Sequence, residues 1–314
     1  MTAAPDRATL VGHARDAIAR GSQSFAAASR LFDRVTRERA WLLYAWCRAC
    51  DDLADGQALG HDQHRVADPQ ARLSQIRHRT AAALAGKPSG DPAFDGLGVL
   101  AREIELPRRF IEDHIAGFAL DADGWRPRSE ADLYRYCYHV AGSVGCMMAL
   151  VMGVPAGDDA TLDRACDLGI AFQLANIARD IEEDDRSGRC YLPEEWLVEM
   201  DFPPGQHMKP PFRARLTVLA RRLAERAQAY EDSARRGTPR LSPRAAWAVL
   251  AAADIYGAIA RRVAQRGDRA WDHRVTTSRA EKLAAIARAG AQAAARARRY
   301  PPAPRDPSLW TRPR

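Results

Sequence analysis

Two acidic clusters interrupt stretches whose apolar periodicity predicts helix, one at 51–55 and one at 176–185. Residues four and eight positions apart lie near one face of a helix, about 6 Å apart from turn to turn. Each cluster therefore forms a stripe of oxygen-bearing side chains: Asp51 and Asp55 in the first, and Asn176, Asp180 and Asp184 in the second. Carboxylates at this spacing repel one another, and inward-facing ones are costly unless a cation neutralises them.

The residues around both clusters favour a cavity wall over the alternative, a solvated helix face. The first cluster follows the apolar run 41–47, the second follows the apolar segments 170–172 and 174–175, and each has an arginine beside it, Arg48 or Arg179. Hard divalent cations such as Mg²⁺ bind a few carboxylates and fill their other positions with water and phosphate oxygens. Two facing stripes of this kind would make a site for a metal ion and a diphosphate.

The rest of the chain has the pattern of helix almost throughout. Aromatic residues make up only 7% of the 314 residues, and Pro and Gly cluster between long helical patterns, without any useful length of strand alternation. The pattern predicts helices at 6–20, 24–31, 34–55, 70–85, 92–104, 107–121, 130–153, 158–184, 193–199, 211–236, 242–266 and 279–298. We therefore expect an all-α protein, with a single helical domain at 1–299 and a Pro- and Arg-rich irregular tail at 300–314.

The net charge of +7 favours an anionic partner. No nucleic-acid module or basic-aromatic pattern occurs, so we expect no nucleic-acid partner, whereas a diphosphate substrate and an anionic membrane surface both fit. The sequence shows neither an apolar signal segment nor an apolar stretch of the roughly 20 residues needed to cross a bilayer. We expect a cytoplasmic protein that associates with membranes peripherally.

Other motifs exclude several classes of protein. The six cysteines include one CxxC, Cys47 and Cys50, but no second pair to complete a zinc site, so we interpret them as core thiols. The pair Gly86-Lys87 lacks the rest of a P-loop, and neither a Gly-x-Ser-x-Gly elbow nor a dinucleotide fingerprint occurs. His139, on an apolar helix, is interpreted as a packed or hydrogen-bonded residue and not as a metal ligand.

Four ordered blocks resemble a known family. They are Gly-Ser-Gln-Ser-Phe at 21–25, Tyr-Ala-Trp-Cys-Arg-Ala-Cys-Asp-Asp at 44–52, the glycine-containing stretch 134–145, and 173–180 leading to 188–193. In this order and spacing the chain resembles the squalene/phytoene synthase family, and within it the bacterial phytoene synthases. The likeness extends over nearly the whole chain.

The resemblance implies the class I isoprenoid (terpenoid) synthase fold, a helical bundle with a central cavity. It implies a prenyl transferase that depends on Mg²⁺, with Mn²⁺ as a substitute, and needs no NADPH. The implied reaction joins two geranylgeranyl diphosphates head to head through prephytoene diphosphate to phytoene, the first committed step of carotenoid biosynthesis. Phytoene desaturase, acting on that product, is the partner enzyme that the resemblance suggests.

Carried over position by position, the resemblance also assigns roles to residues. The metal ligands would be Asp51, Asp55, Asn176, Asp180 and Asp184. Because Asp185 adds a carboxylate next to Asp184, it stays open which of these two reaches the metal. The catalytic set would be those four metal-binding aspartates with Arg48 and Arg179, whose guanidinium groups suit a leaving diphosphate. The residues that contact diphosphate or prenyl chain would be Ser22, Gln23, Ser24, Tyr44, Arg48, Tyr136, Gln173, Arg179, Tyr256 and Arg274.

A carbocation intermediate must be kept from water, so the remaining wall of such a cavity has to be apolar. The side chains that suit this wall are Val140, Ala141, Val144, Met147, Met148 and Phe172. Plain core packing is the alternative, and we expect part of the set to serve each purpose. The small residues at 26–29, ending with Ser29, predict room for the longer geranylgeranyl tail.

Two other functions stay open from the sequence. The first is a dehydrosqualene or hydroxysqualene synthase that uses farnesyl diphosphate. The second is a non-catalytic helical assembly factor, which would have no need to keep costly inward carboxylates.

Overall fold

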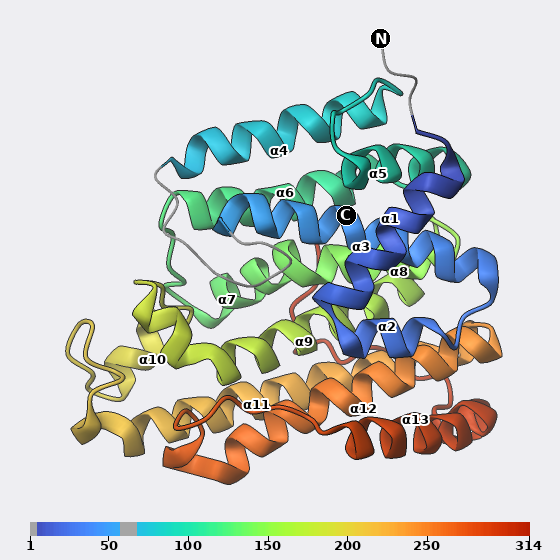
Figure 1. Ribbon diagram of the computed structural model, residues 1–314. Coiled ribbons are helices and arrows are strands. Elements are labelled where there is room, and N and C mark those ends of the chain that lie inside the picture. Colours follow the sequence, from blue (N-terminus) through green and yellow to red (C-terminus); the bar gives the residue numbers. More distant parts are fainter. Residues whose placement is uncertain (1–4, 57–67) are drawn as a thin grey trace.

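The computed structural model describes residues 5–56 and 68–314, except for the side chains of Gln23 and Ser24. Helices account for the fold within these residues (Figure 1). The first six are α1 (Arg7–Gly21), α2 (Gln23–Ser29), α3 (Arg34–Asp55), α4 (Pro69–Leu84), α5 (Pro92–Glu103) and α6 (Arg108–Ala122). The others are α7 (Glu130–Cys137), α8 (Ser143–Val151), α9 (Asp159–Arg186), α10 (Glu194–Glu199), α11 (Arg213–Arg235), α12 (Pro243–Arg266), α13 (Arg279–Ala294) and α14 (Arg296–Arg299).

The all-α prediction is confirmed, and most predicted helices end within two residues of the observed ones. Short polar side chains account for many helix starts, because they accept hydrogen bonds from backbone N–H groups that the helix leaves unpaired. Asp33 caps α3 and Asp158 caps α9 in this way. The predicted helix 130–153 differs: it is interrupted by a π-helix, η1 (Tyr138–Gly142), between α7 and α8.

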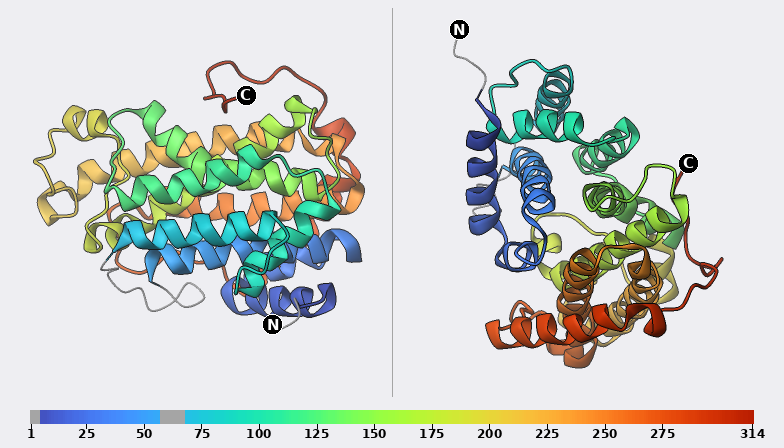
Figure 2. Two further views of the ribbon diagram at one scale, coloured as in Figure 1. Left: turned by 90° about the horizontal axis from the view of Figure 1, so that it is seen from above. Right: turned by 90° about the vertical axis from the view of Figure 1, so that its right-hand side faces the viewer.

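Helix α9 is the centre of the bundle. It packs against η1, α8, α11 and α12, while α3 packs against α1 and α5 on the other side of the molecule. Seen from the side in Figure 2 (right), the N-terminal helices in blue, the green helices and the C-terminal helices in orange form three groups, and α2 of the first group packs against α12 of the last. The two acidic clusters therefore lie on helices that pack against different neighbours, the first on α3 and the second on α9.

Glycines let α9 approach the η1–α8 segment backbone to backbone. A Cβ on Gly169 of α9 would come within 2.2 Å of the Ala141 carbonyl oxygen, and one on Gly145 within 2.3 Å of the Ala165 oxygen. No side chain larger than hydrogen fits at either position. This contact holds the predicted apolar wall against the helix that carries the second acidic cluster.

Residues 300–314 contain no helix or strand, yet they dock along the outer surface of the bundle (Figure 2). Arg305 binds both carboxylate oxygens of Asp167 on α9, at 2.7 and 2.9 Å. The backbone N–H of Trp310 donates to the Tyr230 hydroxyl, and the Trp310 ring packs against Tyr138. Among the described residues, no helix is long and apolar enough to cross a membrane.

Candidate active site

The first acidic cluster occupies the last turn of α3. The helix ends directly after Asp55 because Gly56 adopts a left-handed conformation, with φ of 62°. Arg48 donates to Asp51 at 2.5 Å and lies 3.9 Å from Asp52. Burial raises the pKa of Asp51 to about 6, although the Arg48 guanidinium opposes this shift. The site thus makes a negative charge on Asp51 costly.

The second cluster occupies the last turns of α9. Arg179 binds both oxygens of Asp180, at 2.7 and 2.5 Å, and Arg274 reaches Asp180 at 3.2 Å and Glu183 at 2.5 Å. Asp184 has no ion-pair partner among the residues that the structure describes. Burial, together with the neighbouring Asp180, raises the pKa of Asp184 to about 7.

Asp185, whose role the sequence left open, turns to a different neighbour. Its carboxylate oxygen lies 3.5 Å from Nε2 of His207, a buried residue in the loop before α11. Asp184 instead lies near Asp180, Arg189 and Asp121, which all influence its pKa. This geometry favours Asp184 over Asp185 as the member of the stripe.

Arg189, which follows α9, connects the two clusters. Its guanidinium donates to Asp55 of α3 at 2.7 Å, and it opposes the rise in pKa that burial causes at both Asp184 and Asp121. The ends of α3, α6 and α9 therefore meet at one place. The sequence argument missed Arg189, although it lies in one of the blocks that carry the family resemblance.

The donor set fits a hard divalent cation in its chemistry. All the predicted ligands offer oxygen, and two of the carboxylates have raised pKa values, as expected where a cation is needed to offset burial. In the described part of the chain no three His, Cys, Asp or Glu side chains already lie close enough to hold one ion. Arginines instead neutralise Asp51, Asp55 and Asp180.

Aromatic rings lie beside these arginines. Tyr256 of α12 stacks on Phe172 of α9, with ring centroids 4.3 Å apart, and also contacts Phe25 of α2. Phe25 in turn lies 6.1 Å from the ring of Tyr44 on α3. Burial raises the pKa of Tyr44 to about 12 and also raises the pKa of Tyr256, while the charge of Arg48 opposes both shifts. The structure thus brings together Tyr44, Tyr256 and Arg48, three of the residues that the sequence predicts to contact the substrate.

Tyr136 lies elsewhere in the site than this aromatic group. Its hydroxyl donates to Asp121 at the end of α6, and its ring stacks on Tyr191 with centroids 4.7 Å apart. Asp121 and Tyr191 were not predicted. No spacing pattern marks Asp121 in the sequence, since it falls at the end of a helix, beside a Gly- and Pro-containing break.

The other predicted contact residues are less informative. The Ser22 hydroxyl caps α2 by accepting from the Phe25 N–H, and Gln173 accepts weakly from Asn176 at 3.5 Å. The side chains of Gln23 and Ser24 lie outside the described part of the chain. His139 fits its interpretation as a hydrogen-bonded residue, since its Nδ1 lies 2.9 Å from the Asp113 carbonyl oxygen.

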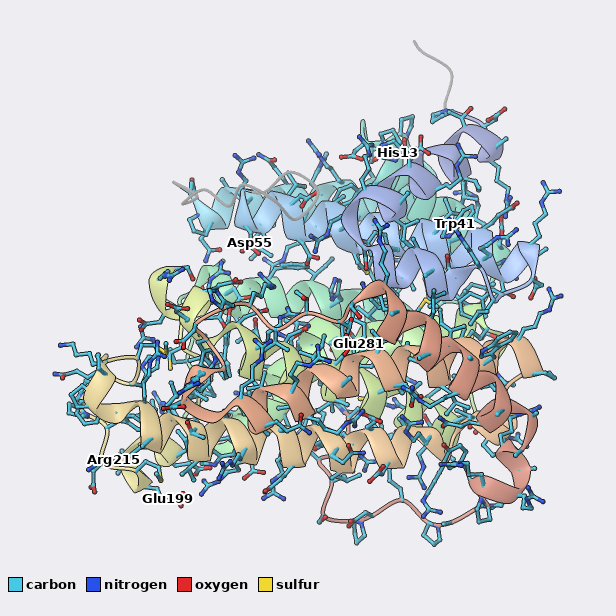
Figure 3. The ribbon with its side chains drawn as sticks, turned by 60° about the horizontal axis from the view of Figure 1, so that its bottom comes forward. His13, Trp41, Asp55, Glu199, Arg215 and Glu281 are labelled. Atoms are coloured by element: carbon cyan, nitrogen blue, oxygen red, sulfur yellow. The ribbon has the colours of Figure 1, made fainter. Side chains whose placement is uncertain are left out.

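The residues predicted to form the apolar wall differ in burial. Met147 is fully buried in the core, whereas Val140, Val144 and Met148 stay partly exposed. Deeper in the bundle, Ser29 of α2 accepts a hydrogen bond from the indole N–H of Trp41 at 2.9 Å. Trp41 and Asp55 lie towards opposite ends of α3 (Figure 3), so the Ser29–Trp41 contact is remote from the acidic end.

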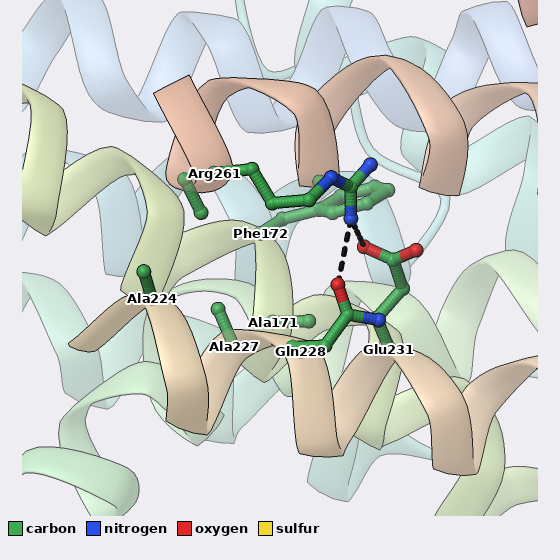
Figure 4. A pocket seen from close by; sticks show the side chains of 9 residues that line it. Ala171, Phe172, Ala224, Ala227, Gln228, Glu231 and Arg261 are labelled. Atoms are coloured by element: carbon green, nitrogen blue, oxygen red, sulfur yellow. Dashed lines mark hydrogen bonds and ion pairs between the residues drawn. The ribbon is translucent and has the colours of Figure 1, made fainter. Parts of the chain in front are cut away.

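Two cavities border the site. A cleft of about 480 Å³ reaches Arg48 and Asp52 from the side of α1 and α5, but no residue of the second cluster lines it. A smaller cavity of about 10 Å³, room for about one water molecule, lies behind Phe172 (Figure 4). Its polar side is closed by Arg261, which binds Gln228 at 2.7 Å and lies 3.5 Å from the buried Glu231.

Comparison with known proteins gives consistent results. The family model described as squalene/phytoene synthase matches residues 18–281. The 15-cis-phytoene synthase of Pantoea ananas is 45% identical over 308 residues, covering 97% of this chain and 98% of that protein. The 15-cis-phytoene synthase of Enterobacter agglomerans is 46% identical, with 93% and 99% covered. Among solved structures, a dehydrosqualene synthase with bound ligand matches with a TM-score of 0.81 and 26% identity, covering 91% of this chain and 96% of that one.

Proposed function

Since this chain belongs to the squalene/phytoene synthase family, we propose that it is a phytoene synthase. It joins two geranylgeranyl diphosphates, first losing one diphosphate to give the cyclopropyl prephytoene diphosphate. It then loses the second, rearranges the skeleton and releases a proton to give phytoene. The observation that carries this proposal is near full-length identity of about 45% to proteins named phytoene synthase, together with two acidic clusters that meet through Arg189.

The proposed ionisation depends on groups that stabilise a leaving diphosphate. We assign Asp51, Asp55, Asn176, Asp180 and Asp184 to hold Mg²⁺, which as a Lewis acid would neutralise charge on the diphosphate. We assign Arg48 and Arg179, which now pair with Asp51 and Asp180, to donate charge-assisted hydrogen bonds to the diphosphate oxygens once they release these aspartates. Arg274 adds a third guanidinium at the same place, because it already shares Asp180.

The remaining residues keep the cationic intermediate from water. Phe25, Phe172 and Tyr256 form a continuous aromatic surface beside the arginines. Aromatic ring faces attract cations, and their bulk displaces solvent. The partly exposed Val140, Val144 and Met148 extend an apolar surface along η1 and α8.

A dehydrosqualene synthase is the second candidate, because a solved structure of that name shares this fold closely. Labelled farnesyl and geranylgeranyl diphosphates, supplied separately with Mg²⁺, distinguish the two by their products. We expect phytoene from the longer substrate and a yield indifferent to NADPH. A preference for farnesyl diphosphate would overturn the assignment, and a reduced product formed only with NADPH would place the enzyme on the squalene branch.

We also propose that the enzyme works at a membrane surface. Its substrate tails and product are lipidic, the net charge is +7, and no described helix can cross a bilayer. A membrane location would let the hydrocarbon product pass to a phytoene desaturase without entering water.

A further inference from the structure

Helix α13 turns an apolar face to the solvent. The helix lies at the outer edge of the bundle (Figure 2, right) and packs mainly against α12, with Ala285, Ala289 and Ala293 buried. A surface helix normally carries polar residues on the side away from the core. At 100° per residue, the exposed residues of α13 that point away from α12 are instead all apolar. They are Ala280, Leu283, Ala284, Ala287, Ala291 and Ala294, which we call the α13 face.

Leu283 distinguishes the α13 face from a run of small side chains. It is 68% exposed, and among the large hydrophobic residues of the described part of the chain only Val198 is as exposed. Val35 and Val218, the other two exposed ones, reach 51% and 43%. A leucine held in water within a wider apolar surface indicates a face that binds a partner.

Basic residues surround the α13 face. Residues 279–299 contain six basic residues and one acidic residue, Glu281. Glu281 already has partners, because it completes the capping box with Ser278 and pairs with Arg262. Within the described residues, no ion pair holds the exposed Arg279 at the start of α13, or Arg298 and Arg299 just past its end. These guanidinium groups are therefore available to an anionic partner.

This combination fits an anionic lipid surface better than a second copy of the chain. An apolar side flanked by arginines is the pattern of a helix that lies in the plane of a membrane interface. Anionic headgroups would neutralise the arginines, whereas a second copy would bring the same arginines face to face. Five of the six residues of the α13 face are alanines, which offer little area, and a stable protein interface buries about 800 Å² on each partner.

We propose that this enzyme docks on anionic membranes through the α13 face, with Leu283 entering the lipid and the flanking arginines binding headgroups. The inference rests on the proposed function, which supplies the lipidic substrates. It also orients the site, because Arg274, which binds Asp180, lies five residues before Arg279. Five residues span at most about 18 Å. The docked helix therefore begins close to the proposed diphosphate site.

The test measures cosedimentation with vesicles of equimolar phosphatidylglycerol and phosphatidylcholine. Leu283→Gln should weaken binding about three- to tenfold, because it removes the largest apolar group from the contact. Val198→Gln is the matched control: Val198 is equally exposed but lies on α10, so this variant should bind as the wild type does. Ala287→Leu, which adds apolar area one turn after Leu283, should strengthen binding by a similar factor. Salt screens charges and not apolar contacts, so the effects at 283 and 287 should persist as salt rises, whereas the loss in Arg279→Gln should fade.

Phytoene formation from detergent-dispersed geranylgeranyl diphosphate should be the same in the Leu283, Ala287 and Val198 variants as in the wild type. A Leu283→Gln variant that binds vesicles as tightly as the wild type would overturn the inference, and so would a wild type that does not bind them. A dimer that light scattering detects in the wild type, and that Leu283→Gln dissociates, would also overturn it, because a second copy would then cover the face. A wild type that forms no phytoene would refute the proposed function, while the vesicle measurements would still report on α13.

Discussion

The two ends of α9 carry oxygen-bearing side chains at the same spacing, but their surroundings differ. Asn176, Asp180 and Asp184 lie four residues apart near the end of the helix, and so do Asp159, Asp163 and Asp167 near its start. At the start, arginines of the C-terminal tail neutralise all three aspartates: Arg305 binds Asp167, and Arg312 and Arg314 bind Asp159 and Asp163. At the end, Asp180 shares its arginines with the proposed substrate site.

The difference shows that spacing alone does not identify a metal site. A stripe of buried carboxylates requires positive charge nearby. The rest of the fold determines whether arginine side chains or a bound ion supply that charge. Asp167 is fully buried and paired with Arg305, whereas Asp184 has no ion-pair partner among the described residues. An incomplete set of counter-ions is therefore the better sign of a ligand site.

The largest expected effect comes from neutralising the second stripe. Asp180→Asn should lower turnover by about 100-fold or more, because changing even the hydrogen-bond partner of a metal ligand costs about 10- to 100-fold, and Asp51→Asn should do the same. Excess EDTA should abolish wild-type activity and Mg²⁺ should restore it. Asp163→Asn, which changes the other stripe, serves as the control and should keep kcat. The helical circular dichroism spectrum checks the fold, and full activity in EDTA would refute the metal site.

The next effect concerns stability at the other end. Arg305→Met leaves the buried Asp167 without its guanidinium and should lower the free energy of unfolding by about 3–5 kcal/mol. Urea denaturation measures the loss. Arg314→Met, at a half-exposed pair, should cost only about 0–1 kcal/mol. Adding Asp167→Leu to Arg305→Met should recover part of the stability, and a stable Arg305→Met variant would show that the tail is not anchored there.

A smaller effect is expected on substrate choice. Ser29→Phe should shift the ratio of kcat/KM towards farnesyl diphosphate by about tenfold, because overfilling a packed cavity costs about 1–3 kcal/mol. The substitution also removes the hydrogen bond from Trp41, so Ser29→Ala is the control that loses this bond without adding bulk. If both variants keep the wild-type ratio, the contact between Ser29 and Trp41 does not determine which substrate chain length the enzyme prefers.

The smallest effect is expected at the membrane. The wild type should cosediment with anionic vesicles, and less so as salt rises. Because Arg305 and Arg312 are held by aspartates, the exposed Arg298 and Arg299 are better placed to bind lipid, each contributing about 1 kcal/mol. Arg298→Gln should reduce binding more than Arg312→Gln does. Equal recovery in the supernatant with and without vesicles would contradict surface association.

Sequence patterns predicted the helices well because their apolar periodicity and caps are local properties. The π-helix η1 was not predicted, since one extra residue per turn barely alters that periodicity, and its contact with Gly169 depends on a distant segment. Asp121 and Arg189 were missed for a related reason. Each is significant through partners far away in the chain, Tyr191 and Asp55.

The docking of the tail is another contact between distant segments that local sequence patterns do not reveal. Its Pro- and Arg-rich composition predicts an irregular segment, and it has no helix, but composition does not reveal that Arg305 meets Asp167, 138 residues earlier. Family resemblance supplied what local patterns could not for Arg274, whose contact with Asp180 spans 94 residues. The roles assigned to the site residues stay predictions until the variants are measured.

The arginine–aspartate pairs of the site bear on the order in which ligands bind. While Arg48 is paired with Asp51 and Arg179 with Asp180, each pair is close to neutral. A cation alone would take the aspartate and leave the arginine uncompensated, and a diphosphate alone would do the reverse. When both arrive, every charge finds a partner. Each ligand should therefore strengthen the binding of the other, by the same factor in both directions.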